Sequence, residues 1–231
     1  MALVVVIAVV TPPTLIANAM RLLATDTFVR NELGRDGFPP DRYGFTDEQR
    51  EALALLGLRS IQAGSEGIVL LERATLPDGS PAFDERELSH MADVRALFVP
   101  IQRGSLVVML AIAVLALALA RTRLRAVVPR GLLAGALATL AVAILLVPVI
   151  LLGFDGFFLR FHEVFFSGDT WRFSNTDTLL RIYPEAFWQD VAMLAAAIVV
   201  GQAIVVALAA GWWARRTRRI RTVSPAPGGA S

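Results

Sequence analysis

The stretch Phe161 to Trp188, FHEVFFSGDTWRFSNTDTLLRIYPEAFW, is the part of this chain from which its organisation can be worked out. It lies between two long apolar segments, yet it combines aromatic rings with many titratable or polar side chains. The members with possible chemical roles are His162, Glu163, Asp169, Trp171, Arg172, Asp177 and Arg181. Ionisable groups near a membrane are costly and usually functional. The stretch therefore predicts a catalytic or binding loop at a membrane surface.

The composition of the whole chain indicates a membrane protein with one modest polar region. Hydrophobic residues make up 55% of the 231 residues, which allows a few membrane spans. Cysteine and lysine are both absent, which excludes disulfides, a cysteine nucleophile and a lysine Schiff base. No basic domain with interleaved aromatic residues is present, so we expect no nucleic-acid binding.

The apolar runs predict an all-α polytopic membrane protein with four transmembrane helices and a helical extracytoplasmic cap. The predicted segments are transmembrane helix 1 at 1–22, an extracytoplasmic helical region at 23–99, transmembrane helix 2 at 100–120, an arginine-rich cytoplasmic loop at 121–130, transmembrane helix 3 at 131–153, an extracytoplasmic loop at 154–186, transmembrane helix 4 at 187–213 and a basic cytoplasmic tail at 214–231. A cleaved signal peptide is the alternative for the first segment, because Ala17-Asn18-Ala19 resembles a cleavage site.

Two capping boxes predict helices in the first polar region. Thr46 with Gln49 opens one helix, and Asp84 with Glu87 opens a second at residues 85–98. Pro100 then marks the entry to the second span. In the final part of the chain, the Tyr183-Pro184 pair predicts a new helix, because proline suits a first helical position.

The arginine clusters predict the orientation of the spans. Segments 121–130 and 214–231 are both rich in arginine, and basic loops stay on the cytoplasmic side. The only two histidines, His90 and His162, then both lie on the extracytoplasmic face. Asp93 follows His90 by three residues, so on a helix it can orient the imidazole.

Histidines on the same side of the membrane suggest acid–base chemistry, but other interpretations are open. A histidine titrates near neutral pH and can both accept and return a proton. Each histidine could instead be a surface residue with no chemical role. A metal site of His90, Asp93, His162 and Glu163 has no HExxH or HxH spacing. A serine nucleophile lacks GxSxG, although Ser89 and Ser167 exist.

Two blocks of sequence resemble one known family. ERELSHMADVRALF and FHEVFFSGDTWRFSNTDTLLRIYPEAFW, with the four spans and the large first outer region, are similar to the Lit-type lipoprotein intramolecular transacylases. These are bacterial four-span integral membrane proteins. The resemblance covers nearly the whole chain and implies that His90 and His162 are the catalytic residues.

The resemblance also implies a reaction. An acyl chain on the middle glycerol carbon of a diacylglyceryl lipoprotein moves to the α-amine of its N-terminal cysteine and leaves a lyso-lipoprotein. No cofactor or metal is expected, and the partners are the lipoprotein substrate and membrane lipids. The expected location is the bacterial plasma membrane, with the active site on the extracytoplasmic face and the protein a monomer.

The expected supporting or substrate-binding residues are Asp93, Arg103, Glu163, Asp169, Trp171 and Asp177, with Arg103 a candidate to face the oxyanion. The alternative function is a non-enzymatic scaffold or sensor that binds lipid or an envelope partner.

Overall fold

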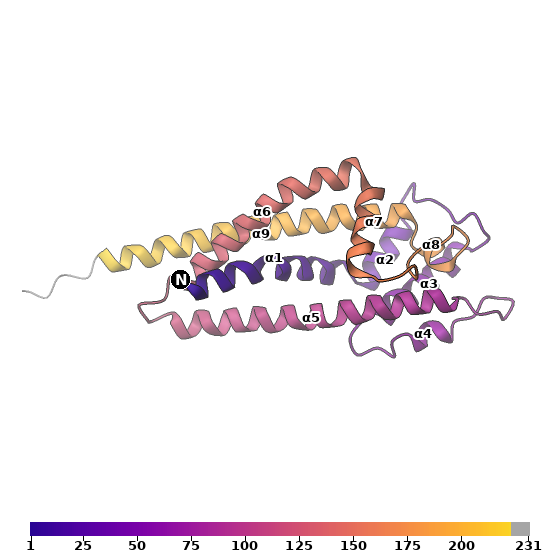
Figure 1. The fold of residues 1–231 in the computed structure, drawn as a ribbon, viewed down its shortest axis with the longest axis horizontal. Coiled ribbons are helices and arrows are strands. Elements are labelled where there is room, and N and C mark those ends of the chain that lie inside the picture. Colours follow the sequence, from indigo (N-terminus) through magenta and orange to yellow (C-terminus); the bar gives the residue numbers. More distant parts are fainter. Residues whose placement is uncertain (223–231) are drawn as a thin grey trace, which may run out of the picture. The chain divides into compact units, whose positions relative to one another are not determined.

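A computed structural model describes the backbone of residues 1–222 and the side chains of residues 1–217. Within this part of the chain all regular structure is helical, apart from one isolated β-bridge between Thr75 and Pro81. The helices in chain order are α1 (Ala2–Leu23), α2 (Asp26–Leu33), α3 (Asp47–Ser60), α4 (Val69–Glu72), α5 (Glu85–Leu119), α6 (Val127–Leu152), α7 (Phe154–Phe165), α8 (Thr178–Ile182) and α9 (Glu185–Thr222), as Figure 1 shows. The expected all-α fold is confirmed.

Four of the described helices are long and apolar enough to cross a membrane: Ala2–Leu23, Glu85–Leu119, Val127–Leu152 and Glu185–Thr217. Their most apolar windows have mean hydropathies between 2.0 and 2.7. Because a bilayer has no water to satisfy backbone groups, helices of this length and composition are suited to span it. The chain is therefore a multi-pass membrane protein.

Two differences from the sequence prediction concern where helices begin and end. The predicted helix at 85–98 and the predicted second span form one continuous helix, α5, which includes Pro100. Proline removes one helical hydrogen bond, but the helix formers on both sides continue the helix. The predicted loop at 154–186 contains two helices, α7 and α8. The end of the predicted tail, 223–231, lies outside the described residues.

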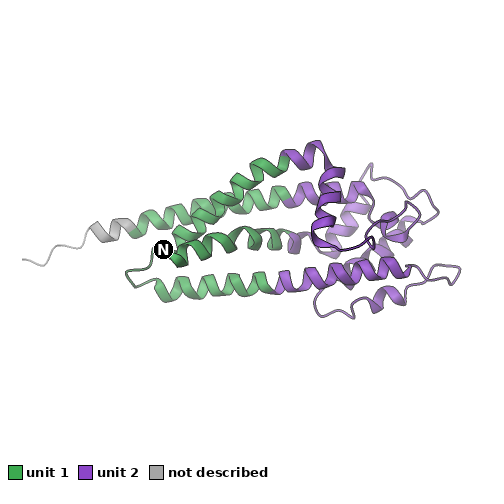
Figure 2. Ribbon diagram, in the orientation of Figure 1, with its two compact units in different colours: residues 1–19, 104–147, 196–231 green, residues 20–103, 148–195 purple. Residues whose placement is uncertain are grey.

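The chain divides into two compact units, coloured separately in Figure 2. Unit 1 comprises Met1–Ala19, Gly104–Val147 and Ala196–Ser231. Two glycines of α6 let α1 approach closely: a Cβ on Gly131 would lie 2.6 Å from Cβ of Ile7, and one on Gly135 would lie 2.5 Å from Cβ of Thr11. Small residues at helix contacts are typical of membrane bundles, so these glycines serve packing.

Unit 2 comprises Met20–Arg103 and Pro148–Ala195 and contains both histidines. The capping box of Thr46 and Gln49 at the start of α3 is confirmed. Ion pairs join α2 to α3, one between Arg30 and Glu51. The hydroxyl of Tyr183, between α8 and α9, donates to the carbonyl of Ala54 in α3. These contacts hold the short helices of unit 2 together.

Candidate functional site

His90 lies near the start of α5, which begins with the predicted second capping box. The backbone N–H of Asp84 donates to Oε2 of Glu87 at 2.8 Å, and the N–H of Glu87 donates to Oδ1 of Asp84 at 2.8 Å. The other carboxylate oxygen of Glu87 accepts the backbone N–H of Leu179 at 2.7 Å. This carboxylate is buried, and it joins the start of α5 to α8. The two carboxylate oxygens of Glu87 thus hold the first turn of α5, next to His90, in place.

His162 lies in the last turn of α7, where the helix itself sets the tautomer of the ring. Nδ1 of His162 is 2.8 Å from the carbonyl oxygen of Phe158, one turn earlier. A carbonyl oxygen only accepts, so Nδ1 carries the proton and Nε2 of the neutral ring holds the lone pair. Burial lowers the pKa of His162, and the hydrogen bond to Phe158 opposes that shift in part. The ring is therefore a neutral base near pH 7, with Nε2 free to accept a proton.

The two histidines meet although 71 residues separate them in the sequence. Their ring centroids are 6.0 Å apart and their planes differ by 29°. Phe166 packs its ring against both imidazoles, with centroids 4.9 Å from His90 and 5.5 Å from His162. Both imidazoles are buried. This spacing places two acid–base groups within reach of one small substrate region.

Aromatic rings enclose the pair, and we call this set the histidine cluster; its members are His90, His162, Phe158, Phe166, Trp171 and Phe173. Phe173 contacts His90 at a centroid distance of 5.4 Å, and Trp171 contacts His162 at 5.1 Å. Phe158 is closer still to His162, at 4.1 Å. Apolar rings exclude water, which strengthens electrostatic interactions within the cluster. Phe158, Phe166 and Phe173 were not singled out as site residues from the sequence.

Within the described part of the chain, two buried polar atoms of the cluster and one of the residue that precedes Trp171 lack a hydrogen-bond partner. They are Nδ1 of His90, Nε1 of Trp171 and Oγ1 of Thr170. Buried polar groups are nearly always paired in proteins, so each exception requires an explanation. Hydrogen bonds to a bound substrate would satisfy these atoms.

Asp93 does not orient His90 as the sequence suggested. Its side chain is exposed, and Nδ1 of His90 has no hydrogen-bond partner among the described residues. The three-residue spacing allows contact on a helix, but the buried face of α5 holds the imidazole against the aromatic rings instead.

Arg103 is also remote from the histidine cluster. It follows His90 by thirteen residues on the same helix, which corresponds to about 20 Å along the helix axis. Its side chain is exposed. It is therefore not positioned to face an oxyanion beside the imidazoles.

Of the remaining expected residues, Glu163 and Asp169 form local ion pairs, Asp177 binds a distant helix, and only Trp171 contacts a histidine. Glu163 pairs with Arg160 at 2.7 Å, and Asp169 pairs with Arg172 at 3.2 Å on the surface. Asp177 accepts a hydrogen bond from Arg86 of α5 at 2.6 Å, and so it fixes the segment before α8. Trp171 lies within the histidine cluster.

One face of α7 is apolar, and its C-terminal half is exposed. Phe154, Phe157, Phe158, Phe161, Val164 and Phe165 lie on this face. Val164 is 75% exposed and Phe165 is 48% exposed. We call this face the apolar stripe of α7; an apolar stripe flanked by charged residues such as Arg160 and Glu163 is typical of a helix that lies in a membrane interface. Phe158 belongs both to this stripe and to the histidine cluster.

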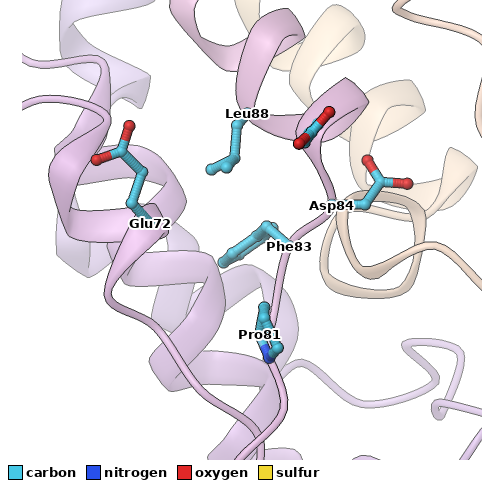
Figure 3. Close-up of a pocket in the computed structure, with 6 residues that line it drawn as sticks. Glu72, Pro81, Phe83, Asp84 and Leu88 are labelled. Carbon is cyan, nitrogen blue, oxygen red and sulfur yellow. The ribbon is translucent and has the colours of Figure 1, made fainter.

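A groove of about 490 Å³ lies beside the start of α5, and its lining does not include either histidine. Glu72, Pro81, Phe83, Asp84, Glu85 and Leu88 line it. In Figure 3 the side chains of Phe83 and Leu88 lie between the carboxylates of Glu72 and Asp84. Within the described residues no group of three or more His, Asp or Glu side chains lies together in a way that could hold a metal ion.

The fold and the cluster define a class: a helical multi-pass membrane protein with a buried pair of histidines. The sequence model of the family "Lipoprotein intramolecular transacylase Lit" matches residues 71–188. This segment contains both histidines and is more than half of the 231 residues. The chain therefore belongs to the Lit family.

The chain is also similar to individual proteins. An uncharacterised protein of Aquifex aeolicus is 31% identical over 185 residues, which cover 80% of this chain and 82% of the relative. The membrane-integral lipoprotein intramolecular transacylase Lit of Bacillus cereus has a similar structure, with a TM-score of 0.75 over 94% of this chain and 97% of that chain. A variant of that protein with a histidine-to-alanine replacement matches with a TM-score of 0.67, covering 94% of each chain. Both are 17% identical in sequence, so they support the fold.

Proposed function

We propose that this protein transfers the sn-2 acyl chain of a diacylglyceryl-modified bacterial lipoprotein to the α-amine of the lipoprotein's own N-terminal cysteine. His90 and His162 provide the acid–base catalysis. The observation that carries the proposal is the buried pair of imidazoles, 6.0 Å apart, in a chain of the Lit family.

The proton transfers follow from the tautomer of His162. Nε2 takes a proton from the substrate amine as its nitrogen attacks the ester carbonyl carbon. The tetrahedral intermediate then collapses, and the bond from that carbon to the glycerol oxygen breaks. The leaving oxygen receives a proton from one of the two imidazoles, which gives an amide and a free hydroxyl at the middle glycerol carbon. An α-amine has a pKa of about 8, so a histidine is a well-matched base.

The chain's own residues also suit an intramolecular transfer. The nucleophile and the ester belong to one substrate molecule, so no acyl-enzyme nucleophile is needed, and the chain has no cysteine. The enzyme must instead fold the substrate so that amine and ester meet. The apolar stripe of α7 offers a surface for acyl chains that leads to Phe158, the residue whose carbonyl binds His162. We place this site on the extracytoplasmic face of the plasma membrane, because arginine-rich segments follow α5 and are expected in the cytoplasm.

Expression in a bacterium without N-acylating activity tests the proposal. Mass spectrometry of lipoprotein N-terminal peptides should reveal N-acylated lyso forms with the wild-type protein. His90→Gln and His162→Gln should reduce this product about 10²- to 10⁴-fold at equal membrane levels, as loss of an acid–base group typically does. Asn175→Ala, an exposed position in the same segment, is the matched control and should leave the product unchanged.

Free α-amines with both esters intact, at good wild-type expression, would contradict the proposal. That result would favour a scaffold or sensor that binds lipid without changing it. Undiminished product in both histidine variants would instead remove these residues from the reaction and leave the activity to other groups.

A further inference from the structure

Trp171 carries a buried hydrogen-bond donor that is unpaired among the described residues. The residue is 8% exposed, and its indole Nε1 finds no partner in the part of the chain that the structure describes. An indole N–H can only donate, so it needs an acceptor such as a carbonyl or an anionic oxygen. The preceding hydroxyl, Oγ1 of Thr170, is also buried without a partner. Two neighbouring residues thus present unused polar atoms.

The Trp171 donor belongs to a ring that packs against the proposed base. The Trp171 ring centroid is 5.1 Å from that of His162, whose Nε2 holds the free lone pair. The next residue also contacts the indole: the guanidinium of Arg172 lies 4.9 Å from the centroid of the Trp171 ring. Arg172 in turn pairs with Asp169. The indole is therefore fixed beside the imidazole before any substrate arrives.

Acyl transfer needs a donor at the carbonyl oxygen as well as a base. When the amine attacks, the π electrons of the ester carbonyl move onto its oxygen, which becomes negatively charged. Preorganised donors at that oxygen often make the largest single contribution to the rate. The cationic residue that the sequence suggested for this role, Arg103, is about 20 Å away along α5.

We propose that the indole N–H of Trp171, assisted by the hydroxyl of Thr170, donates hydrogen bonds to the oxyanion that forms on the ester carbonyl. This assignment rests on the proposed transacylase function. Charge develops on the oxygen as the carbon–nitrogen bond forms, and it returns to the carbonyl as the bond to the glycerol oxygen breaks. The amine proton passes through the histidines, and the indole keeps its own proton throughout. The aromatic rings of the histidine cluster exclude the water that would otherwise compete for the oxyanion.

Removal of the N–H with little change of shape tests the assignment. Trp171→Phe retains an aromatic ring, and β-(3-benzothienyl)alanine at position 171 keeps the full bicyclic shape with sulfur in place of N–H. With purified protein and a synthetic diacylglyceryl-cysteinyl peptide, we expect both replacements to lower kcat about 10²-fold and to change KM little. Thr170→Val should give a smaller loss. Trp212→Phe is the matched control, since Trp212 is 59% exposed, and its kcat should equal that of the wild type.

A change in the substrate separates a donor from a packing residue. Replacement of the carbonyl oxygen of the reacting ester by sulfur gives a thionoester, whose sulfur is a weaker hydrogen-bond acceptor than the oxygen. The wild type should lose rate on this thionoester, whereas the benzothienyl variant should lose much less, because it has no N–H to lose. If both proteins lose rate equally on the thionoester, or if the benzothienyl variant keeps the wild-type kcat on the oxygen ester, Trp171 is not the oxyanion donor. Either result leaves the proposed transacylase function standing. If the wild type forms no amide from the oxygen ester, the proposed function fails and this assignment fails with it.

Discussion

The ion pair between Asp41 and Arg181 offers a direct test of how unit 2 is held together. Oδ1 of Asp41 accepts from Nε of Arg181 at 3.0 Å, and Oδ2 accepts from Nη2 at 2.9 Å. The side chains are 2% and 10% exposed. Arg181 lies in α8, and its own carbonyl accepts a hydrogen bond from the buried Arg50 at 2.8 Å. Asp41→Asn keeps the shape of the side chain but leaves the Arg181 cation buried without its counter-ion.

The size of the effect follows from the pKa of Asp41. Burial by itself would raise this pKa, but hydrogen bonds from Arg181 and from the backbone N–H groups of Phe45 and Tyr43 outweigh burial and lower it to about 2. A shift of nearly two units from the usual value is worth about 2–3 kcal/mol. Rupture of a buried pair can cost about 3–5 kcal/mol, but the Arg181 guanidinium keeps its position 3.3 Å from the centroid of the Phe45 ring. We therefore expect Asp41→Asn to lower stability by about 2–3 kcal/mol, or Tm by about 5–10 °C.

Thermal unfolding in detergent measures this change. Because the folded pKa of Asp41 is below its unfolded value, the stabilisation is present above about pH 4 and is lost as pH falls through about 2. The gap in Tm between wild type and variant should therefore close in acid. Asp36→Asn, the same change at an exposed position nearby, should alter stability by less than about 0.5 kcal/mol. A variant as stable as the wild type at pH 7, or a gap that persists unchanged to pH 2, would refute the reasoning.

Two further predictions concern helix packing and histidine protonation. Gly135→Ala should destabilise unit 1 by about 1–3 kcal/mol through overpacking, since the new Cβ would lie 2.5 Å from Cβ of Thr11. Gly201→Ala is the control, because a Cβ at position 201 would have nothing within 4 Å, and this variant should keep the wild-type Tm. Burial lowers the pKa of His162, so its contribution to stability is full above about pH 6.5 and is lost as pH falls toward the folded pKa. Between pH 7 and 5, Tm should therefore fall less steeply in His162→Gln than in the wild type, and equal slopes would contradict this.

The membrane helices could be predicted from the sequence because length and composition are sufficient for that purpose. An apolar run of about 20 residues has few structures open to it other than a membrane helix. The helix starts at Asp47 and Glu85 were also predictable, because capping boxes act within four residues. Pro100 misled the prediction, since a proline inside a helix costs one hydrogen bond but does not always end the helix.

Helix α7 was the main structural feature missed, although its signal is present. Phe154, Phe157, Phe158, Phe161 and Phe165 recur at spacings of three and four residues, which is the period of an amphipathic helix. The density of polar residues after position 161 favoured a loop. Recognition of this period would also have placed the carbonyl of Phe158 one turn before His162.

The surroundings of the histidines depend on contacts that one sequence does not reveal. Asp93 was selected as the partner of His90 because it is close in the chain, and local spacing is all that helical periodicity provides. In the structure, the neighbours of His90 are instead His162, Phe166 and Phe173. These come from about 70 to 80 residues later in the sequence. Their approach depends on Glu87 and Asp177, whose bonds to Leu179 and Arg86 join α5 to the segment around α8.

The closed nature of the cluster bears on why the proposed reaction would be a transfer and not a hydrolysis. Amine and water compete for the same ester carbonyl, and water is far more abundant outside the membrane. Each imidazole is less than a tenth exposed, and phenylalanine rings pack against both of them. The burial of both imidazoles limits the access of bulk water to His162, whereas a tethered amine would arrive with its own acyl chains against the apolar stripe of α7. On the proposed function, the aromatic rings thus select the amine as nucleophile because they exclude water. The histidines do not contribute to this selection, since a base can activate either an amine or a water molecule.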